Sequence, residues 1–437
     1  MRVEPDFPAG DGAQAFRPEG RVLMLDLEGH DLADERETAR LVTRIYRYAR
    51  EGRAIAVPQT APSLAALCEK TGLSVISPAA GRVPADSAFD VAFGVDADAL
   101  GDGEQAAHED GSGRRLRVAV AGLGLVGGGA ALRLLADHAA YDFCAALVRE
   151  PFKDRSGLVV EQVTNDISAF LAAKPDVVID ALPDGAAGRR LIESALDRGV
   201  SVVSANKQAL AGALADLAAL AEENDARLCY AASVGGGAPF VETTKRARRE
   251  GEIAGLEATL NGTVNYILTA LASGERFDAA VKAAQQAGFA EPDPSADLSG
   301  ADAKAKLAIL SFTAFGEEID LGAIDIEPLT AAKAATIANA GGVWRQISRL
   351  ERTNAGELRA SVRFERRDDD ALFSGARFEA NALRIRLSGD GLVECRGKGA
   401  GRAPTVESIF GDLEEIRRAA AFRPKRAGTL AQAGATA

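Results

Sequence analysis

The chain has 437 residues, of which 47% are hydrophobic and 26% are charged, as is typical of a globular protein with two or three domains. The formal net charge of -12 would repel a phosphate backbone, so nucleic acid is not expected as a partner. The first residues lack the apolar core of a signal peptide, and no uncharged apolar stretch is long enough to span a bilayer. We therefore expect a cytoplasmic protein with no membrane partner.

Cysteine and histidine are too few and too scattered to indicate a metal site or a histidine base. The cysteines include no C-x-x-C pair, which argues against zinc and against a disulfide framework, and we interpret all four as small core residues. They are Cys68, Cys144, Cys229 and Cys395. The three histidines form no recognisable constellation. Acid–base chemistry must then come from carboxylates, lysines or tyrosines.

Residues 1–113 are predicted to form an N-terminal extension of unknown role, a small α/β segment followed by a linker. Apolar runs begin at Arg21 and Ala54, and each is followed by a helical pattern. The helical patterns cover 33–50 and 63–70. The stretch 96–115 is rich in Gly, Asp, Glu and Ser, and it holds too little apolar surface to offset its ordering entropy.

Residues 114–238 alternate between strand and helix patterns, as in a doubly wound parallel sheet, whose ligands bind at the carboxyl ends of the strands. Strands are predicted near 116–121, 143–148, 176–181 and 201–204, and helices over 130–138 and 210–224.

Residues 239–392 predict a second domain of the α+β class. Its predicted helices cover 239–249 and 302–315, and its predicted strands lie near 255–260, 360–365 and 382–387. Residues 393–437 are expected to return to the nucleotide domain and to end in a tail, with a last helix after Arg417 that frays. The predicted fold class is α/β: a doubly wound dinucleotide-binding sheet plus an α+β catalytic and dimerisation domain, with a small extra N-terminal α/β segment.

A glycine turn, Gly122-Leu-Gly-Leu-Val-Gly127, joins a predicted strand to a helix, the context that a dinucleotide fingerprint requires. The first glycine makes the tight turn, Gly124 lets the backbone approach a pyrophosphate, and Gly127 packs the helix on the strand. Leu125 and Val126 open the helix, whose N-terminus faces the phosphates. A glycine turn in an unrelated α/β domain is the alternative, but the flanking strand and helix favour a nicotinamide dinucleotide.

The end of the second strand decides between NAD and NADP, because an acid there holds the ribose hydroxyls and an arginine accepts a 2′-phosphate. Arg149 and Glu150 stand at this position, with Lys153 and Arg155 nearby. The excess of positive charge favours NADP over NAD. The alternative is that these side chains are solvated loop charges.

Two further segments concentrate polar groups inside apolar sequence. Lys207 directly follows a strand, at the sheet edge where the cofactor is expected. Asp302 and Lys306 are four residues apart on one helical face, and the alternative is a surface ion pair worth about 0.3–0.5 kcal/mol. Since their helix is otherwise apolar, we expect a half-buried lysine among carboxylates.

A dehydrogenase must move the proton of an alcohol while a hydride leaves its carbon. A lysine can take or return that proton if its pKa falls from about 10.4 toward neutrality. Desolvation and a second nearby cation lower such a pKa, whereas neighbouring carboxylates raise it. Glu291 and Asp297 are well suited to hold a substrate ammonium group. Together these residues predict a small, amino-acid-like substrate.

These residues give the chain a resemblance to the homoserine dehydrogenase family. The resemblance covers about residues 115–415 and depends on segments that occur in the family's order. They are Gly122-Leu-Gly-Leu-Val-Gly127, Val203-Ser-Ala-Asn-Lys207, Ser233-Val-Gly-Gly-Gly-Ala-Pro239, Asn261-Gly-Thr-Val-Asn-Tyr-Ile-Leu268, Gly288-Phe-Ala-Glu-Pro-Asp-Pro294 with Asp297, Asp302 and Lys306, and Gly397-Lys-Gly-Ala-Gly-Arg-Ala-Pro-Thr405. The Asn-Gly-Thr and Glu-to-Lys segments are distinctive of this family among dinucleotide folds.

The resemblance implies an enzyme that interconverts L-homoserine and L-aspartate 4-semialdehyde with NAD or NADP, in threonine and methionine biosynthesis. It makes Lys306 the proton donor or acceptor and Lys207 a second essential lysine beside cofactor and substrate. The substrate-binding residues that it implies are Glu291, Asp297, Asp302 and Thr263. It also implies that Gly399, in the closing glycine segment, lies at the cofactor and that the enzyme is a homodimer.

The chain departs from the family's pattern at three points. Ala231 stands where the family commonly has an acid that helps to hold a monovalent cation, so the backbone carbonyls of Val234 and Gly236 are the remaining metal candidates. Lys398 stands where the family usually has proline, and residues 1–113 lie outside the match. Two alternatives follow: a related enzyme acting on another small hydroxy or amino acid, and a non-catalytic nucleotide-sensing relative.

Overall fold

The chain divides into two compact units, 1–107 and 108–437. The computed structural model describes residues 21–26, 54–56, 75–76, 90–96, 115–153, 160–353, 355–389, 391–399 and 401–421. In the first unit the described residues form a parallel sheet of order β3-β2-β1-β4. Its strands are β1 (Arg21–Asp26), β2 (Ala54–Ala56), β3 (Val75–Ile76) and β4 (Asp90–Asp96). The helices expected over 33–50 and 63–70, and most of the linker expected over 96–115, lie outside the described residues.

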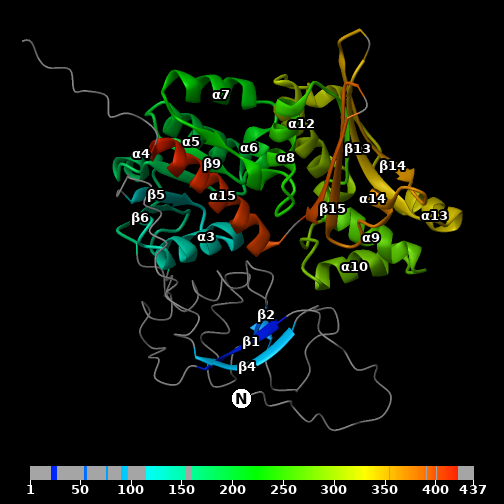
Figure 1. The fold of residues 1–437 in the computed structure, drawn as a ribbon, viewed down its shortest axis with the longest axis horizontal. Helices are drawn as coiled ribbons and strands as arrows, with labels where there is room; N and C mark the ends of the chain where they lie inside the picture. Colours follow the sequence, from blue (N-terminus) through cyan, green and yellow to red (C-terminus); the bar gives the residue numbers. More distant parts are fainter. Residues whose placement is uncertain are drawn as a thin grey trace, which may run out of the picture. The chain divides into compact units, whose positions relative to one another are not determined.

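The second unit begins with a six-stranded parallel sheet (Figure 1). Its strands are β5 (Leu116–Ala121), β6 (Tyr141–Leu147), β7 (Gln162–Thr164), β8 (Val177–Asp180), β9 (Ser201–Ser204) and β10 (Leu228–Cys229). The order β10-β9-β8-β5-β6-β7 is that of a dinucleotide-binding fold. The chain first builds outward from β5 to β7 and then restarts on the other side of β5. Ligands of such sheets bind at this reversal, between β5 and β8.

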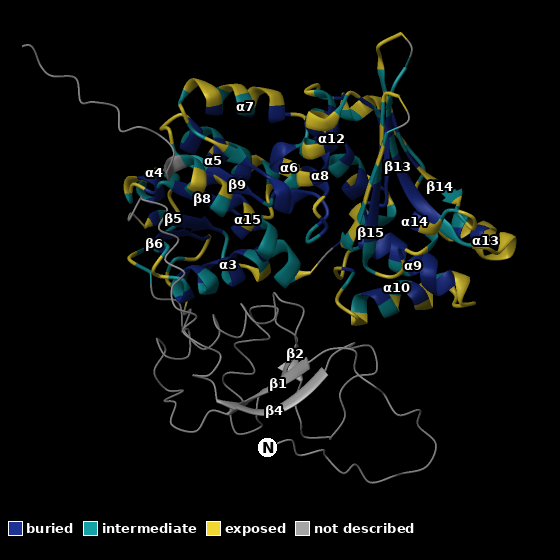
Figure 2. Ribbon diagram, viewed as in Figure 1, coloured by how far each residue is buried: buried dark blue, intermediate teal, exposed yellow. Residues whose placement is uncertain are grey.

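Helices cover both faces of this sheet, which is why its strands are almost continuously apolar. The helices of this domain are α3 (Leu125–Ala136), α4 (Ile167–Ala172), α5 (Gly185–Leu196), α6 (Lys207–Leu210), α7 (Leu214–Glu223) and α15 (Arg402–Ala421). Helices α3 and α15 share one apolar cluster with the sheet, and α4, α5 and α7 share another on the opposite face. Figure 2 shows the strands as the buried layer between these helices.

The second domain surrounds a six-stranded mixed sheet of order β12-β14-β13-β11-β15-β16, antiparallel except for the β12–β14 pair. Its strands are β11 (Ile253–Ala258), β12 (Asp325–Ile326), β13 (Trp344–Arg352), β14 (Leu358–Arg366), β15 (Ala380–Leu387) and β16 (Leu392–Lys398). Its helices are α8 (Phe240–Glu250), α9 (Gly262–Ala272), α10 (Phe277–Gln286), α11 (Ser295–Leu298), α12 (Ala301–Phe315), α13 (Ala331–Ala340) and α14 (Ala371–Ser374). None of the helices in the described part of the chain is long and apolar enough to cross a membrane.

The two sheets of the second unit share a continuous apolar core. One buried cluster runs from Leu210 of α6 through Val234 to Leu307 of α12. This shared core holds the carboxyl edge of the parallel sheet against the helices of the second domain, and the polar groups of both domains meet there.

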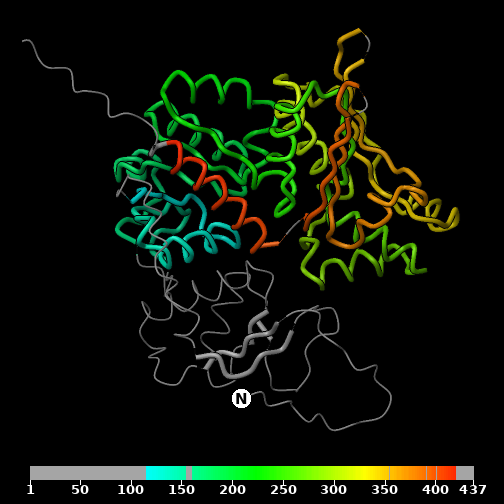
Figure 3. Tube along the Cα trace, in the orientation of Figure 1, coloured from blue at the N-terminus to red at the C-terminus, as the bar shows by residue number. Residues whose placement is uncertain are grey.

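The predicted fold class is confirmed, but several elements differ from the prediction or were not predicted, among them the last helix and strand β13. The last helix, α15, begins at Arg402 rather than after Arg417 and returns to pack beside α3, as the red and cyan segments show in Figure 3. Its buried residues, Val406, Ile409, Phe410, Leu413 and Ile416, recur at helical spacing. Strand β13 was missed because its sequence, Trp-Arg-Gln-Ile-Ser-Arg-Leu-Glu-Arg, has no apolar alternation.

Candidate functional site

The glycine turn after β5 has the geometry of a phosphate cradle. Gly122 adopts a φ of +85°, and a Cβ atom there would lie 2.6 Å from the Ala181 carbonyl oxygen. A Cβ atom at Gly127 would lie 1.8 Å from the Gly122 carbonyl oxygen, so only glycine fits. At Gly124, by contrast, an added Cβ atom would meet nothing within 4 Å. The outer glycines are thus required by packing, whereas the middle glycine borders open space.

Helix α3 points its N-terminus at this space. It begins at Leu125, and its N-cap Gly124 provides no side-chain hydrogen bond. Backbone N–H groups of the first turn therefore remain free for an anion, and the helix dipole favours one. The residues present fit the pyrophosphate of a dinucleotide.

Arg149 lies two residues after the end of β6, the strand that neighbours β5, and its side chain is exposed. This is the position from which a side chain reaches the 2′ position of the adenosine ribose. Glu150, of opposite charge, is exposed beside it, and Arg155 lies outside the described residues.

The centre of the site is a carboxylate held between two lysines from different domains. Asp302, on the first turn of α12, has Oδ1 3.0 Å from the Nζ of Lys207 and Oδ2 2.7 Å from the Nζ of Lys306. Asp302 and Lys306 are only 8% and 12% exposed. The pair is therefore not the surface ion pair that the spacing alone allowed.

Burial and the neighbouring charges shift the pKa of Asp302 in opposite directions. Burial alone would raise the pKa of Asp302, but the ammonium groups of Lys306 and Lys207 outweigh burial and lower that pKa to about 2. The Asp302 carboxylate in turn raises the pKa of Lys207. Burial raises the pKa of Asp297, which lies beside them. At neutral pH the centre thus holds an ionised Asp302 paired with a cationic Lys207.

Asn261 joins these residues, and its role could not be read from residue type and spacing alone. Its Nδ2 donates to Asp297 Oδ1 at 2.7 Å and to Asp302 Oδ2 at 2.9 Å. Its Oδ1 accepts from the backbone N–H of Val264 and caps α9. The same side chain therefore starts a helix and spaces the two carboxylates. The Asn-Gly-Thr motif was a signal for it.

The other predicted substrate residues lie around this centre with different exposures. Glu291 is exposed, and its charge contributes to the raised pKa of Lys207. Thr263 is buried, and its hydroxyl donates to the Phe289 carbonyl oxygen at 2.6 Å. Lys306 also donates to the Leu260 carbonyl oxygen at 2.9 Å. The loop after α10, the start of α9 and the start of α12 thus converge on one place.

The closing glycine segment packs against the second domain. Gly399 is buried, and a Cβ atom there would lie 2.2 Å from Asn381 Nδ2. A Cβ atom at Gly397 would lie 2.5 Å from the Ala238 Cα atom, and Gly237 donates its N–H to the Lys398 carbonyl oxygen at 3.0 Å. Close backbone packing therefore explains these glycines, and contact of Gly399 with a cofactor stays a prediction.

The loop with the weak cation candidates is held by side chains of α15. The Ser408 hydroxyl donates to the Gly236 carbonyl oxygen at 2.6 Å, and the Ala231 N–H donates to Asp412 Oδ2 at 2.9 Å. Val234 is fully buried. One of the two candidate carbonyls already has a donor, and no acid stands at Ala231. These residues fit a monovalent cation poorly.

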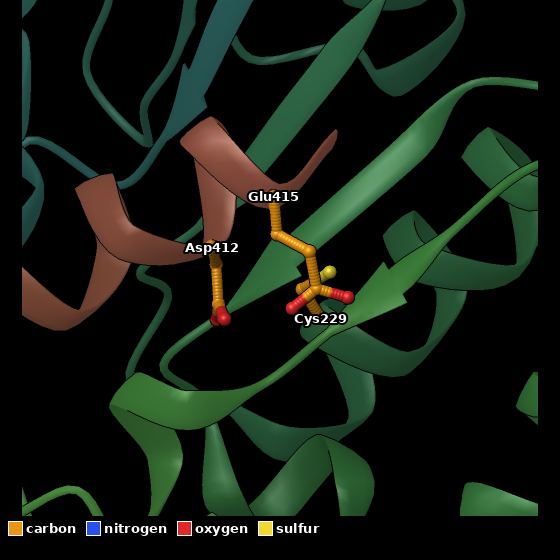
Figure 4. A group of neighbouring side chains, drawn as sticks. All are labelled: Cys229, Asp412 and Glu415. Carbon is orange, nitrogen blue, oxygen red and sulfur yellow. The ribbon is translucent and has the colours of Figure 1, made fainter. Parts of the chain in front are cut away.

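Beside this loop, Asp412 and Glu415 of α15 project toward Cys229 of β10 (Figure 4). Cations already oppose these acids: Arg227 lies 3.6 Å from Glu415, and Lys245 lowers the pKa of Asp412. Burial outweighs that effect and raises the pKa of Asp412 to about 7. Burial also raises the pKa of the Cys229 thiol. A protonated thiol among paired acids is a poor metal ligand set. Cys144 and Cys229 are buried, as predicted, whereas Cys395 is only partly buried and Cys68 lies outside the described residues.

Comparisons with known proteins agree with this arrangement. The family model "Homoserine dehydrogenase, NAD binding domain" matches residues 122–231, and the model "Homoserine dehydrogenase" matches residues 239–413. A homoserine dehydrogenase of Mycobacterium leprae is 34% identical over 321 residues, which cover 69% of this chain and 72% of that protein. An NAD(+)-dependent homoserine dehydrogenase of Pseudomonas canavaninivorans is 32% identical over 240 residues, covering 54% of this chain and 68% of that protein.

A solved structure extends the likeness to the fold. The homoserine dehydrogenase of Thiobacillus denitrificans superposes with a TM-score of 0.63 at 26% identity, covering 70% of this chain and 74% of that chain. The segments that the two family models match contain the site residues Gly122, Lys207 and Lys306. The chain belongs to the homoserine dehydrogenase family.

Proposed function

We propose that the chain interconverts L-homoserine and L-aspartate 4-semialdehyde, using the Lys207, Asp302 and Lys306 array as its reaction centre. The observation that carries the proposal is a nearly buried carboxylate bridging two lysines, one from each domain. Lys207 follows β9 at the same carboxyl edge as the glycine turn after β5. Substrate bound at the array would therefore lie next to the cofactor.

Lys306 is the group that exchanges a proton with the substrate hydroxyl. An ammonium group has three N–H bonds, and two of those of Lys306 point to Asp302 and to the Leu260 carbonyl oxygen. In aldehyde reduction the third N–H gives its proton to the carbonyl oxygen, and in homoserine oxidation the neutral amine of Lys306 takes the hydroxyl proton on its lone pair. The nicotinamide, when bound, takes or supplies the hydride. Asp302 stays ionised throughout because its pKa is about 2, and it fixes the orientation of both lysines.

The carboxylates that border the array hold the amino-acid part of the substrate. Glu291 and Asp297 lie within electrostatic range of Lys207, and carboxylates bind an ammonium group by charge-assisted hydrogen bonds. Asn261 keeps Asp297 and Asp302 in fixed positions. An amino acid with a hydroxyl group on its side chain satisfies both halves of this site.

Steady-state assays with the purified protein test which substrate the chain turns over. Homoserine should reduce the cofactor, whereas L-2-aminobutyrate, which lacks the hydroxyl, should not. Turnover of another hydroxy acid in preference to homoserine would favour the first alternative. Cofactor binding without turnover of any such substrate would favour the nucleotide-sensing alternative.

We infer a preference for NADP from Arg149. Replacing Arg149 by Ala should raise KM for NADP about tenfold while leaving KM for NAD nearly unchanged. Only NADP has a 2′-phosphate, so only NADP loses a contact with the arginine. Arg190→Ala, which changes an exposed arginine on α5, is the matched control. Equal effects of Arg149→Ala on both cofactors would refute the preference. The homodimer and the cytoplasmic location stay predictions.

A further inference from the structure

Asp180 is a fully buried carboxylate that the proposed chemistry does not use. It is the last residue of β8. Its Oδ1 accepts from the backbone N–H of Leu182 at 3.1 Å, and its Oδ2 accepts from the Ser204 hydroxyl at 3.0 Å. The Asn206 side chain is a further donor. Burial raises the pKa of Asp180 to about 6, since neutral donors only partly replace water.

The partners of Asp180 build the turn that carries Lys207. Ser204 ends β9, and its Oγ accepts from the backbone N–H of Asn206 at 3.1 Å. Asn206 is the N-cap of α6: its Oδ1 accepts from the Ala209 N–H at 3.2 Å. Lys207 is the first residue of this short helix. An unbroken hydrogen-bonded path therefore leads from Asp180 to the residue before Lys207.

The surroundings allow this turn little freedom. The Asn206 amide nitrogen also donates to the Asp184 carbonyl oxygen at 3.0 Å. A Cβ atom at Gly188 of α5 would lie 2.3 Å from that nitrogen and 3.0 Å from Asp180 Oδ2. The Ala205 N–H donates to the Asp180 carbonyl oxygen at 2.9 Å. The backbone before Lys207 is thus held on several sides, with Asp180 at the centre.

We propose that Asp180 is a positioning residue for Lys207, acting through Ser204 and Asn206 to set the first turn of α6 so that the Lys207 ammonium reaches Asp302. That the position of Lys207 matters for the reaction rests on the proposed function. The position of Lys207 is independent of that function, because its ion pair with Asp302 at 3.0 Å is a structural feature.

The direction of each hydrogen bond shows why a carboxylate is needed. An ionised Asp180 only accepts, so the single proton of the Ser204 hydroxyl points to it and a hydroxyl lone pair points to Asn206. Asp180→Asn keeps the size but places an NH2 group toward one of the three donors. Ser204→Ala removes the link altogether and leaves the Asn206 N–H without its acceptor. Both variants should loosen the first turn of α6.

Lysine footprinting of the full chain tests the position of Lys207. Limited acetylation with mass spectrometry should show Lys207 about three to ten times more reactive in Asp180→Asn and Ser204→Ala than in the wild type. This factor corresponds to the loss of one buried hydrogen bond. Exposed Lys282 is the internal reference. Ser311→Ala is the matched control, because Ser311 is equally buried and its hydroxyl donates to the Glu317 carbonyl oxygen.

Steady-state kinetics test whether the position of Lys207 matters for the turnover of homoserine. Both variants should lower kcat/KM for homoserine about tenfold, while cofactor affinity changes less than about twofold. Unchanged Lys207 reactivity in a folded Asp180→Asn or Ser204→Ala protein would overturn the proposal. So would a parallel rise at Lys282, which indicates general loosening. If the wild-type chain does not turn over homoserine, the proposed function fails, and footprinting still decides the positioning.

Discussion

Replacing Asp302 by Asn should cost stability as well as activity. Lowering the pKa of this carboxyl from 3.8 to about 2 corresponds to about 2 kcal/mol, since one pKa unit is about 1.4 kcal/mol. Because the folded pKa is lowered, this stabilisation is fully present above pH 3.8 and is lost as the pH falls toward 2. The variant should therefore lose about 2–5 kcal/mol of unfolding free energy at pH 7.5, from the value that the pKa shift gives up to the about 3–5 kcal/mol typical of breaking a buried ion pair.

The different exposures of the two lysines refine this expected loss of stability. Lys207 is 36% exposed, so solvent screens its share of the interaction, and most of the loss should come from leaving Lys306 unpaired. The double variant Asp302→Asn, Lys306→Met should then regain about 1 kcal/mol or more, because the buried ammonium is gone.

Urea unfolding, followed by the fluorescence of Trp344, gives the assay. Trp344 is the only tryptophan of the chain and opens β13 in the second domain. Asp297→Asn is the control: its pKa is raised by burial, so a neutral amide should cost little there, and the new side chain can still accept from Asn261. Equal losses in the Asp302 and Asp297 variants would refute the reasoning that the two lysines stabilise Asp302.

Three other changes separate chemistry, cofactor binding and packing. Lys306→Met should lower kcat about 10²–10⁴-fold with cofactor affinity retained in a fluorescence titration, because Lys306 exchanges the substrate proton and lies outside the glycine turn; a loss of cofactor binding would contradict this. Gly124→Ala should weaken NADPH binding about tenfold without lowering Tm, since nothing lies within 4 Å of the added Cβ atom; unchanged affinity would argue against a phosphate there. Asp412→Asn should be more stable than wild type by up to about 4 kcal/mol at pH 8 but not below pH 4. The pKa of Asp412 is raised from 3.8 to about 7, so the stability it contributes is present below 3.8 and lost as the pH rises through 7. Urea unfolding at both pH values tests this, and a pH-independent difference would contradict it.

Features encoded by neighbours along the chain could be predicted from the sequence. The glycine turn combines local backbone demands with a flanking strand and helix, so the packing demands at Gly122 and Gly127 could be predicted, while the approach of a pyrophosphate to Gly124 stays a prediction. The pairing of Asp302 with Lys306 follows from helical spacing, since residues four apart share a face. Alternating strands and helices were enough to predict a parallel, doubly wound sheet.

Other features depend on which distant segments the fold brings together. Helical spacing cannot tell a surface ion pair from a buried one, and it does not show that Lys207, from another domain, binds the second oxygen of Asp302. Strand β13 carries polar residues that only neighbouring strands and helices bury, among them Arg345 and Ser348. Its pattern therefore did not indicate a central strand.

The sequence by itself determined the glycine turn, the fold class and the residue types of the proposed reaction centre, because short-range sterics and periodicity govern them. The tertiary structure decided that Asn261 spaces two carboxylates, that α15 holds the Ala231 to Gly236 loop, and that Asp180 lies behind Lys207. These contacts join residues from about 24 to 181 positions apart. Their geometry depends on strand order and domain packing, which no local pattern encodes.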